Sequence, residues 1–452
     1  MNEINTIVAL ATAPGIGGVA VVRISGPEAL GIGQSLHSMG AQAVKNPREL
    51  LLGGLKLGGD LTDKALIVAM PSPNSYTGED VVELQLHGGA AVVAHVIKSA
   101  IAKGARPAEP GEFTKRAYLN GKLDLIEAEA VAEVIAADTE ASLQQAELKA
   151  SGTLSRQIEQ LRARLVALIA QLSANLDFGE EDIPDLDLVK IEQEARAIKD
   201  QVDTWINGAK VAAIVRDGLR VAIVGLPNAG KSSLLNALVG YERAIVTNVA
   251  GTTRDTLEER IVVNGLGVVF VDTAGLRDTA EVVEAIGVER SQEAGRQAQI
   301  VLLAASADQS KKQLADEVAR LKLNPALKVL AVQTKVDAHP ATVDWPIRPA
   351  KIIKTSAKTG AGLDDLRQVI YDIGVGSVSL NSAVISSERQ IAALKACGHE
   401  LGQVISAITA GAPADVLAGE LSLAAEQLGG LLGESVGAEV INAIFANFCI
   451  GK

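Results

Sequence analysis

The spacing of hydrophobic residues changes along the chain, and each spacing is typical of a different kind of structure. Up to about residue 121, short β-rich runs alternate with turns that contain Gly and Pro. These runs predict strands over residues 6–11, 19–25, 65–70 and 81–87, and a helix over residues 90–103. We expect this part to fold as an α+β domain with several loops, not as a regular βαβ array.

Beyond residue 122 the apolar residues recur at intervals of three and four, which is the period of an amphipathic helix. This pattern covers residues 124–176, continues over 185–215 after a break at Ile183 and Pro184, and returns over 386–452. Between the two helical regions, alternating strands and helices run from about residue 219 to 373.

The return to helix at the end of the chain predicts the domain organisation. A last segment of this size buries little surface by itself, and the ends of a compact domain usually lie close together. We therefore expect an N-terminal α+β domain (1–121) and a discontinuous helical domain (122–217 and 377–452). Inserted into the latter is an α/β domain (218–376), with a mostly parallel sheet and helices on both faces. The alternative is two separate helical units.

The length and composition of the chain argue against several classes of protein. A length of 452 residues predicts two or three domains, and a net charge of −12 argues against a whole-surface affinity for nucleic acid or anionic membrane. The aromatic content of 2% argues against a broad base-stacking platform. With only Cys397 and Cys449, and with neither a signal-peptide pattern nor an apolar run of spanning length, we expect a soluble cytoplasmic protein.

A glycine-rich segment follows the first strand of the α/β region. Residues 221–224 are apolar, residues 225–232 read GLPNAGKS, and a helical run follows, which satisfies the Walker A spacing in its strand–loop–helix context. Gly225 and Gly230 permit a loop whose N–H groups point at phosphate oxygens. Lys231 supplies a positive charge to the β- and γ-phosphates, and the Ser232 hydroxyl can ligate Mg²⁺.

Further motifs follow in the order of a GTPase domain. Two strands about an Asn264-Gly265 turn lead into DTAG (272–275), where Asp272 can hold Mg²⁺ through water and the Gly275 N–H can sense the γ-phosphate. Upstream, Thr253 can complete the magnesium shell. Strands over residues 329–333 and 351–354 lead into TKVD and SAK. The predicted GTP contacts are Asn228, Ala229, Gly230, Lys231, Ser232, Ser233, Thr247, Asn248, Val249, Ala250, Gly251, Thr252, Thr253, Asp272, Thr273, Ala274, Gly275, Thr334, Lys335, Asp337, Ser356, Ala357 and Lys358.

Asp337 predicts the choice of base. A carboxylate accepts hydrogen bonds from guanine N1–H and the exocyclic amine, whereas adenine presents no such pair of donors. Lys335 can lie along the base plane and brace the phosphate loop. The usual motif begins with Asn, but Thr334 stands here, and a hydroxyl replaces only part of the bonding of an amide.

The residue that orients the attacking water is not the usual glutamine, because Leu276 follows DTAG. Glu281, Glu284 and Glu289 are candidates, although a solvated face is the commoner role of a glutamate. Asn228 and the backbone carbonyls of residues 247–252 could hold a monovalent cation against the phosphates.

The whole chain closely resembles the bacterial tRNA-modification GTPase family, which acts at the wobble uridine with a flavin-dependent partner. The resemblance rests on TIVALATAPGIGGVAVVRISG, PNSYTGEDVVELQLHGG, RPAEPGEFTKRAYLNGKLDLIEAEAV, NAGKSSLLNAL, IVTNVAGTTRD, DTAGLRD and the closing FCIGK. It implies an N-terminal folate-binding domain that forms a homodimer, a heterotetramer with the flavin protein, and addition of a carboxymethylaminomethyl group to tRNA. It also implies G domains that pair across potassium.

The resemblance also implies particular site residues. The contacts to 5-formyl-tetrahydrofolate fall on Arg23, Glu83, Lys122 and Lys452. Potassium falls on Asn228, Thr247, Val249 and Thr252, magnesium on Ser232 and Thr253, and Glu284 matches the water-orienting glutamate.

Simpler interpretations exist for several of these residues. Arg23 and Glu83 would make an ordinary ion pair, and Lys122 could cap or solvate a helix. Cys449 is by default a buried small hydrophobe, although the family tail suggests a catalytic thiol. A basic cluster of Lys103, Arg106, Lys115 and Arg116 is more typical of a solvated surface than of a tRNA contact.

The favoured hypothesis is a potassium-stimulated GTPase that modifies the wobble uridine of tRNA with a folate one-carbon unit. The alternative is a regulatory GTPase that assists RNA or ribosome assembly without carbon chemistry. That alternative leaves the N-terminal domain and FCIGK without a role, and the chain shows no KH-type GxxG in context and no basic tail.

Overall fold

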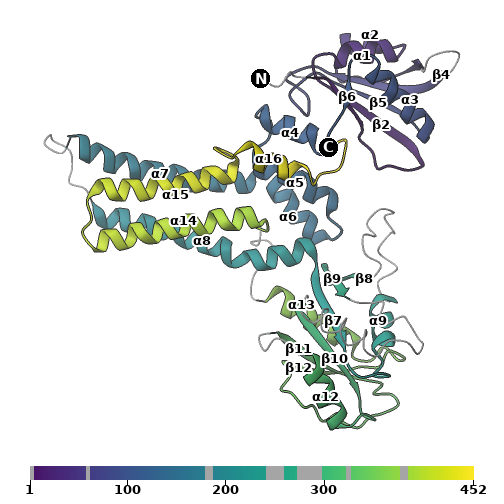
Figure 1. Cartoon of the computed structure of the whole chain (residues 1–452), viewed down its shortest axis with the longest axis vertical. Coiled ribbons are helices and arrows are strands. Elements are labelled where there is room, and N and C mark those ends of the chain that lie inside the picture. Colours follow the sequence, from purple (N-terminus) through teal and green to yellow (C-terminus); the bar gives the residue numbers. More distant parts are fainter. Residues whose placement is uncertain are drawn as a thin grey trace. The chain divides into compact units, whose positions relative to one another are not determined.

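The computed structural model describes residues 5–56, 62–178, 187–240, 259–271, 298–321, 327–376 and 385–452, and its chain forms two compact units (Figure 1). One unit contains Met1–Ala136, Ala146–Val202 and Ala392–Lys452, and the other contains Ala137–Gln145 and Asp203–Ile391. The first unit is therefore built from segments on both sides of the second, as insertion requires.

The first unit begins with a six-stranded sheet in the order β3-β4-β5-β2-β1-β6. The strands are β1 (Ile7–Leu10), β2 (Gly17–Ser25), β3 (Leu51–Lys56), β4 (Thr62–Met70), β5 (Val81–Gly88) and β6 (Arg106–Pro107). All neighbours are antiparallel except β1 and β6. The four predicted strands are confirmed. The edge strand β3 was missed because LLGGLK holds two glycines and an exposed Leu52, so it lacks clear alternation.

Period-two alternation separates the two faces of this sheet. Val22, Ile24 and Leu84 face the helices α1 (Ala29–Leu36), α2 (Gly40–Lys45) and α3 (Ala90–Ile101), with which they share one apolar core. On β2 and β5, Arg23 and Glu83 alternate with these core residues and pair in register with each other. Both polar side chains therefore lie on the sheet face away from these helices.

The rest of the first unit is helical. It contains α4 (Glu112–Leu119), α5 (Leu125–Ala136), part of α6 (Glu140–Ala150), α7 (Thr153–Phe178), part of α8 (Leu188–Asp217), most of α14 (Glu388–Thr409), α15 (Ala414–Leu432) and α16 (Ala438–Phe445). Helices α7 and α15 lie side by side although more than two hundred residues separate them in sequence (Figure 1). Buried leucines and isoleucines at helical spacing line the facing sides, including Ile158, Leu165, Leu172, Leu421 and Leu428. The discontinuous helical domain is thus confirmed.

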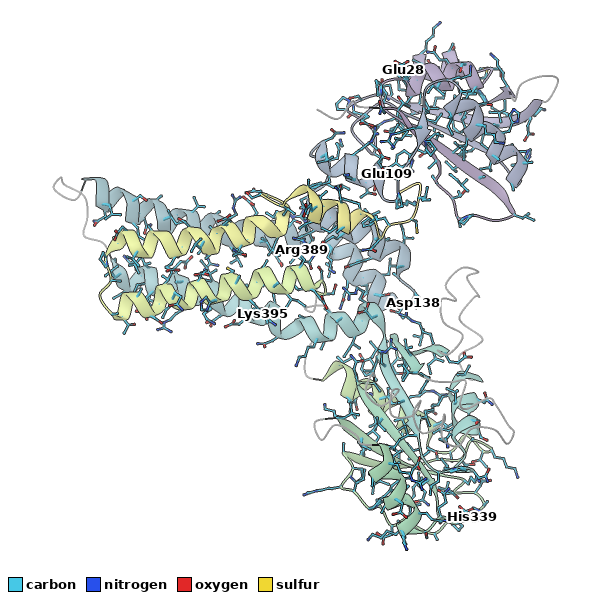
Figure 2. All side chains as sticks on the ribbon, in the orientation of Figure 1. Glu28, Glu109, Asp138, His339, Arg389 and Lys395 are labelled. Atoms are coloured by element: carbon cyan, nitrogen blue, oxygen red, sulfur yellow. The ribbon has the colours of Figure 1, made fainter. Side chains whose placement is uncertain are left out.

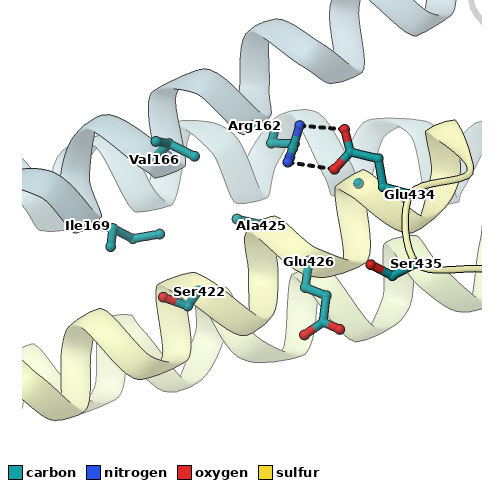
Figure 3. Close-up of a pocket in the computed structure, with 9 residues that line it drawn as sticks. Arg162, Val166, Ile169, Ser422, Ala425, Glu426, Glu434 and Ser435 are labelled. Carbon is teal, nitrogen blue, oxygen red and sulfur yellow. Dashed lines mark hydrogen bonds and ion pairs between the residues drawn. The ribbon is translucent and has the colours of Figure 1, made fainter.

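A shallow groove of about 290 Å³ lies along α7 and α15 (Figure 3). Two ion-pair contacts bridge it at one end, from Arg162 Nη1 to Glu434 Oε1 at 2.9 Å and from Arg162 Nη2 to Glu434 Oε2 at 2.6 Å. Val166 and Ile169 line its wall.

The second unit contains a six-stranded sheet in the order β12-β11-β10-β7-β9-β8. The strands are β7 (Leu219–Val224), β8 (Glu259–Val263), β9 (Leu266–Val271), β10 (Ile300–Ser306), β11 (Lys328–Thr334) and β12 (Lys351–Lys354). Only β8 is antiparallel to its neighbour. One face packs on α9 (Lys231–Gly240) and α13 (Leu363–Val375), the other on α12 (Lys311–Leu321). The predicted mostly parallel sheet with helices on both faces is confirmed.

The predicted hairpin about Asn264 and Gly265 is confirmed, since β8 and β9 pair across it and both turn residues have positive φ, 50° and 83°. Asp138, labelled in Figure 2, precedes α6. Its carboxylate accepts from Arg260 Nε of this hairpin at 2.6 Å. Within the described ranges, no helix has both the length and the apolar character needed to cross a membrane.

Candidate functional site

The glycine-rich loop of the second unit connects the end of β7 to the start of α9 at Lys231. Gly225, Asn228 and Gly230 all have positive φ, at 143°, 60° and 84°. A Cβ at Gly225 would clash with the carbonyl oxygen of Ala304 on the neighbouring strand, so only glycine fits there. Strand, loop and helix are thus arranged as a phosphate-binding loop requires.

Lys231 is the cation of this loop. Its Nζ donates to the carbonyl oxygens of Gly225 at 2.7 Å and Leu226 at 2.9 Å. Burial lowers the pKa of Lys231, and the charge of Glu317 opposes that shift. The ammonium is therefore held inside the loop, where phosphate oxygens could replace the two carbonyls.

The first turn of α9 carries the predicted hydroxyl ligands. Ser232 and Ser233 are exposed there, whereas Ala229 in the loop is buried. An exposed hydroxyl next to Lys231 can reach both a metal ion and a phosphate, which fits Mg²⁺ bound with a nucleotide. No group of three or more His, Cys, Asp or Glu that could hold a metal occurs among the described residues.

The end of β11 is tied to the same loop. Thr334 Oγ1 lies 2.6 Å from the carbonyl oxygen of Ala229 and 3.3 Å from that of Ala305. Lys335 Nζ donates to the carbonyl oxygen of Asn228 at 2.7 Å. The TKVD segment therefore braces the loop at two consecutive carbonyls, 105 and 107 residues away in sequence.

Asp337 and Ser356 form the predicted base-recognition end of the site. Ser356 Oγ donates to Asp337 Oδ1 at 2.7 Å, and this hydrogen bond is the main reason why the pKa of the Asp337 carboxyl is lowered. Ser356 is fully buried beyond the end of β12, whereas Asp337 is exposed. Ser356 thus fixes one carboxylate oxygen and leaves the other to accept from a ligand.

Several predicted residues lie outside the described part of the chain. They are Thr247, Asn248, Val249, Ala250, Gly251, Thr252, Thr253, Asp272, Thr273, Ala274, Gly275 and Glu284. The structure therefore brings together the loop (228–233), Thr334, Lys335, Asp337 and Ser356.

A second cluster surrounds Arg23 on the first unit's sheet. Arg23 Nε donates to Glu83 Oε1 at 2.8 Å, and the two side chains are only 16% and 18% exposed. The guanidinium carbon lies 5.4 Å from the ring centre of Tyr76 and 5.6 Å from that of Phe113. These aromatic contacts were missed, because no local pattern marks Tyr76 or Phe113 as neighbours of Arg23.

The C-terminal tail lies against this cluster. Arg23 Nη1 donates to the carbonyl oxygen of Gly451 at 3.5 Å, and the Phe113 N–H donates to that of Lys452 at 3.2 Å. Gly451 has a φ of 94°, and a Cβ there would clash with the carbonyl oxygen of Leu10, so the tail requires glycine at this point.

The other residues predicted for this site have different surroundings. Lys122 is exposed, and its Nζ donates to the carbonyl oxygen of Pro73, on the loop that carries Tyr76. Cys449 is exposed, so its default interpretation as a buried hydrophobe is wrong, whereas Cys397 is buried. Burial raises the pKa of the Cys397 thiol to about 12, which leaves it inert at neutral pH.

Two members of the predicted basic cluster, Arg106 and Arg116, are neutralised by carboxylates. Arg106 donates to both oxygens of Glu112 at 2.8 and 2.6 Å, and Arg116 pairs with Glu112 at 2.9 Å and with Glu79 at 3.0 Å. Because the Arg116 side chain is only 11% exposed, its interpretation as a solvated surface charge is wrong. This network fixes the start of α4 beside the C-terminal tail.

We expect the network to weaken in acid. Burial would raise the pKa of Glu112, but hydrogen bonds from Arg106, the Glu109 N–H and Arg116 lower it to about 2. A carboxyl group whose pKa is lowered by folding stabilises the fold at pH values above its ordinary pKa of 4.5. This contribution is lost as the pH falls toward 2. Hydrogen exchange of the α4 amides should show an opening free energy about 3 kcal/mol lower at pH 2 than at pH 6.

Glu112→Gln should remove most of this pH dependence, because a neutral amide does not titrate. Exposed Glu28, just before α1, supplies a matched control, since no described contact joins its side chain to this network, and Glu28→Gln should keep the wild-type profile. An unchanged pH profile in Glu112→Gln would contradict the assignment.

The chain is similar to known proteins over almost its full length, which includes both sites. The sequence model described as the GTP-binding protein TrmE N-terminus matches residues 6–122, and that of the MnmE helical domain matches residues 125–449. Three relatives, each called tRNA modification GTPase MnmE, align with almost the full length of this chain. That of Thermus thermophilus is 40% identical and covers 100% of both chains, that of Synechococcus elongatus is 39% identical and covers 99% of both, and that of Neisseria meningitidis serogroup B is 39% identical and covers 100% of both.

Proposed function

This chain belongs to the MnmE family of tRNA modification GTPases, and we propose that it hydrolyses GTP with Mg²⁺ to drive modification of the wobble uridine of tRNA. The observation that carries the proposal is that one chain contains two sites with defined side-chain contacts. One is the loop braced by Thr334 and Lys335, and the other is the Arg23–Glu83 pair under the C-terminal tail.

The nucleotide would bind with its phosphates on the loop and its base at Asp337. Lys231 would give up its two carbonyl partners and donate to phosphate oxygens, which neutralises charge that develops during hydrolysis. Ser232 and Thr253 would ligate Mg²⁺, which supplies further positive charge when bound. Glu284 would orient the attacking water in place of the missing glutamine.

Arg23, Glu83, Lys122 and Lys452 would hold a tetrahydrofolate one-carbon donor. The Arg23–Glu83 pair suits a pterin ring, which carries adjacent hydrogen-bond donors and acceptors, and Tyr76 and Phe113 give the pair an apolar surround. The bound folate supplies the one-carbon unit. Cys449, which is exposed two residues before Gly451, would be the substrate-facing thiol. A flavin-dependent partner and a second copy of the chain complete the proposed assembly.

Arg23→Ala should lower folate affinity at least about tenfold, because it leaves the mostly buried Glu83 without its cation. Binding can be measured by calorimetry with 5-formyl-tetrahydrofolate, and the modified nucleoside by mass spectrometry of tRNA from cells that carry only the variant. Lys98→Ala removes a charge from the exposed face of α3 and should behave as wild type. Normal folate binding and modification in Arg23→Ala would favour the assembly-factor alternative.

Potassium, but not sodium, should stimulate GTP hydrolysis. The motivating feature is Asn228, an amide residue of the phosphate loop that has a positive φ. Steady-state rates in potassium and sodium chloride at equal ionic strength test this. Asn228→Ala should make the two rates equal, and equal rates in the wild type would remove the proposed cation.

A further inference from the structure

The hydroxyl of Thr334 has one proton and two carbonyl neighbours. Its oxygen lies 2.6 Å from the Ala229 oxygen, which is the distance of a strong O–H···O hydrogen bond, and 3.3 Å from the Ala305 oxygen. Both partners are acceptors, so the proton is committed to the protein. The residue is only 4% exposed, which keeps water from replacing either carbonyl as a partner.

Guanine presents different chemistry on its two edges. N1–H and the exocyclic amine are donors on the Watson–Crick edge, whereas N7 on the opposite edge is an acceptor. In the proposed binding mode, with the donor edge of the base at Asp337, the opposite edge with N7 would face the end of β11 and the loop that this strand braces. Only a hydrogen-bond donor can pair with N7. The Thr334 hydroxyl already donates its one proton to a carbonyl, and its two lone pairs cannot bind another acceptor.

An amide at this position would differ, because the side chain of Asn carries two N–H donors. One could bind the Ala229 carbonyl while the other reached N7. Lys335, the next residue, does not replace it, because its ammonium donates to Asn228 at 2.7 Å on the phosphate side.

On the basis of the proposed GTP site, we infer that Thr334 braces the phosphate loop and offers no hydrogen-bond donor to guanine N7. The site therefore accepts guanine nucleotides altered at N7. Selection of guanine then depends on Asp337, whose free carboxylate oxygen is oriented by Ser356.

The test compares GTP with 7-deaza-GTP, in which a C–H group replaces N7. Dissociation constants are measured on the full-length protein with Mg²⁺, by competition with a fluorescent GTP analogue. The wild type should bind the two nucleotides within about twofold of each other, because one neutral hydrogen bond changes affinity about three- to tenfold. A larger loss with 7-deaza-GTP, of about threefold or more, would show a donor to N7 and would overturn the inference.

Three substitutions separate the brace from the base contact. Thr334→Asn should create a preference for GTP over 7-deaza-GTP of about three- to tenfold. Thr334→Ser keeps the donor and should keep the ratio near one. Thr334→Val leaves the Ala229 carbonyl unpaired and should weaken both nucleotides by the same factor. A Thr334→Val variant that loses affinity for GTP only would also overturn the inference.

Failure of the proposed function gives a different result. If the wild type binds neither guanine nucleotide in preference to ATP, the GTP site itself is wrong. If it binds GTP well and 7-deaza-GTP poorly, only the role of Thr334 is wrong.

Discussion

Replacement of Lys231 by alanine is expected to lower the rate of GTP hydrolysis by about 10²–10³-fold, the usual effect of removing one donor from a site of developing negative charge. The ammonium is enclosed by the loop, with carbonyl oxygens at 2.7 and 2.9 Å, so its charge acts in a poorly solvated place. Lys335, the other lysine of this site, does not replace that charge, because its ammonium is held on the Asn228 carbonyl.

The measurement is single-turnover phosphate release with saturating GTP, which separates hydrolysis from binding. Lys328→Ala is the matched control, since Lys328 is exposed at the start of β11 and lies away from the loop. A Lys231→Ala protein that keeps more than a tenth of the wild-type rate would show that this lysine does not face the phosphates.

The second large effect is expected at Asp337. Asp337→Asn should weaken GTP binding by about 10²-fold and make xanthosine triphosphate the preferred nucleotide, because polar mismatches in such a site are strongly rejected. Ser356 determines how the new amide group is oriented. Its hydroxyl donates to Oδ1, so the new amide would keep its oxygen on Ser356 and turn its N–H₂ group outward.

An outward N–H₂ group would oppose the donors of guanine and match the carbonyl that xanthine carries at C2. Affinities for GTP, xanthosine triphosphate and ATP can be measured by calorimetry with Mg²⁺. Asp344→Asn is the control, because this exposed carboxylate pairs with Lys311 at 3.0 Å and lies outside the base-recognition end. Unchanged GTP affinity in Asp337→Asn would contradict guanine recognition by this residue.

Much of the fold was predictable because it rests on local patterns. The Asn264-Gly265 turn, the alternation of β5 and the helical spacing of α7 all depend on residues within a few positions of each other. Strand β3 had no such pattern, since its glycines and exposed Leu52 hide the alternation, and only pairing with β4 defines it.

The candidate nucleotide site was also largely predictable, because each motif is a contiguous run whose spacing carries its chemistry. The contacts between these runs were harder to predict from the sequence. The bond from Thr334 to Ala229 joins positions 105 residues apart, and it turns an apparent weakness of the motif into a brace of the loop. Around Arg23, Tyr76 and Phe113 had no signal at all, since an isolated aromatic residue is ordinary in any sequence.

By itself the sequence determined the kinds of element, the loop that can hold phosphate and the carboxylate that can select guanine, because backbone preference and side-chain chemistry are local properties. Only the tertiary structure decided which distant groups meet. Arg23 reaches the Gly451 carbonyl across 428 residues, and the tail can approach because glycine alone fits beside the Leu10 carbonyl. Such contacts depend on the packing of the whole chain, which no single stretch of residues encodes.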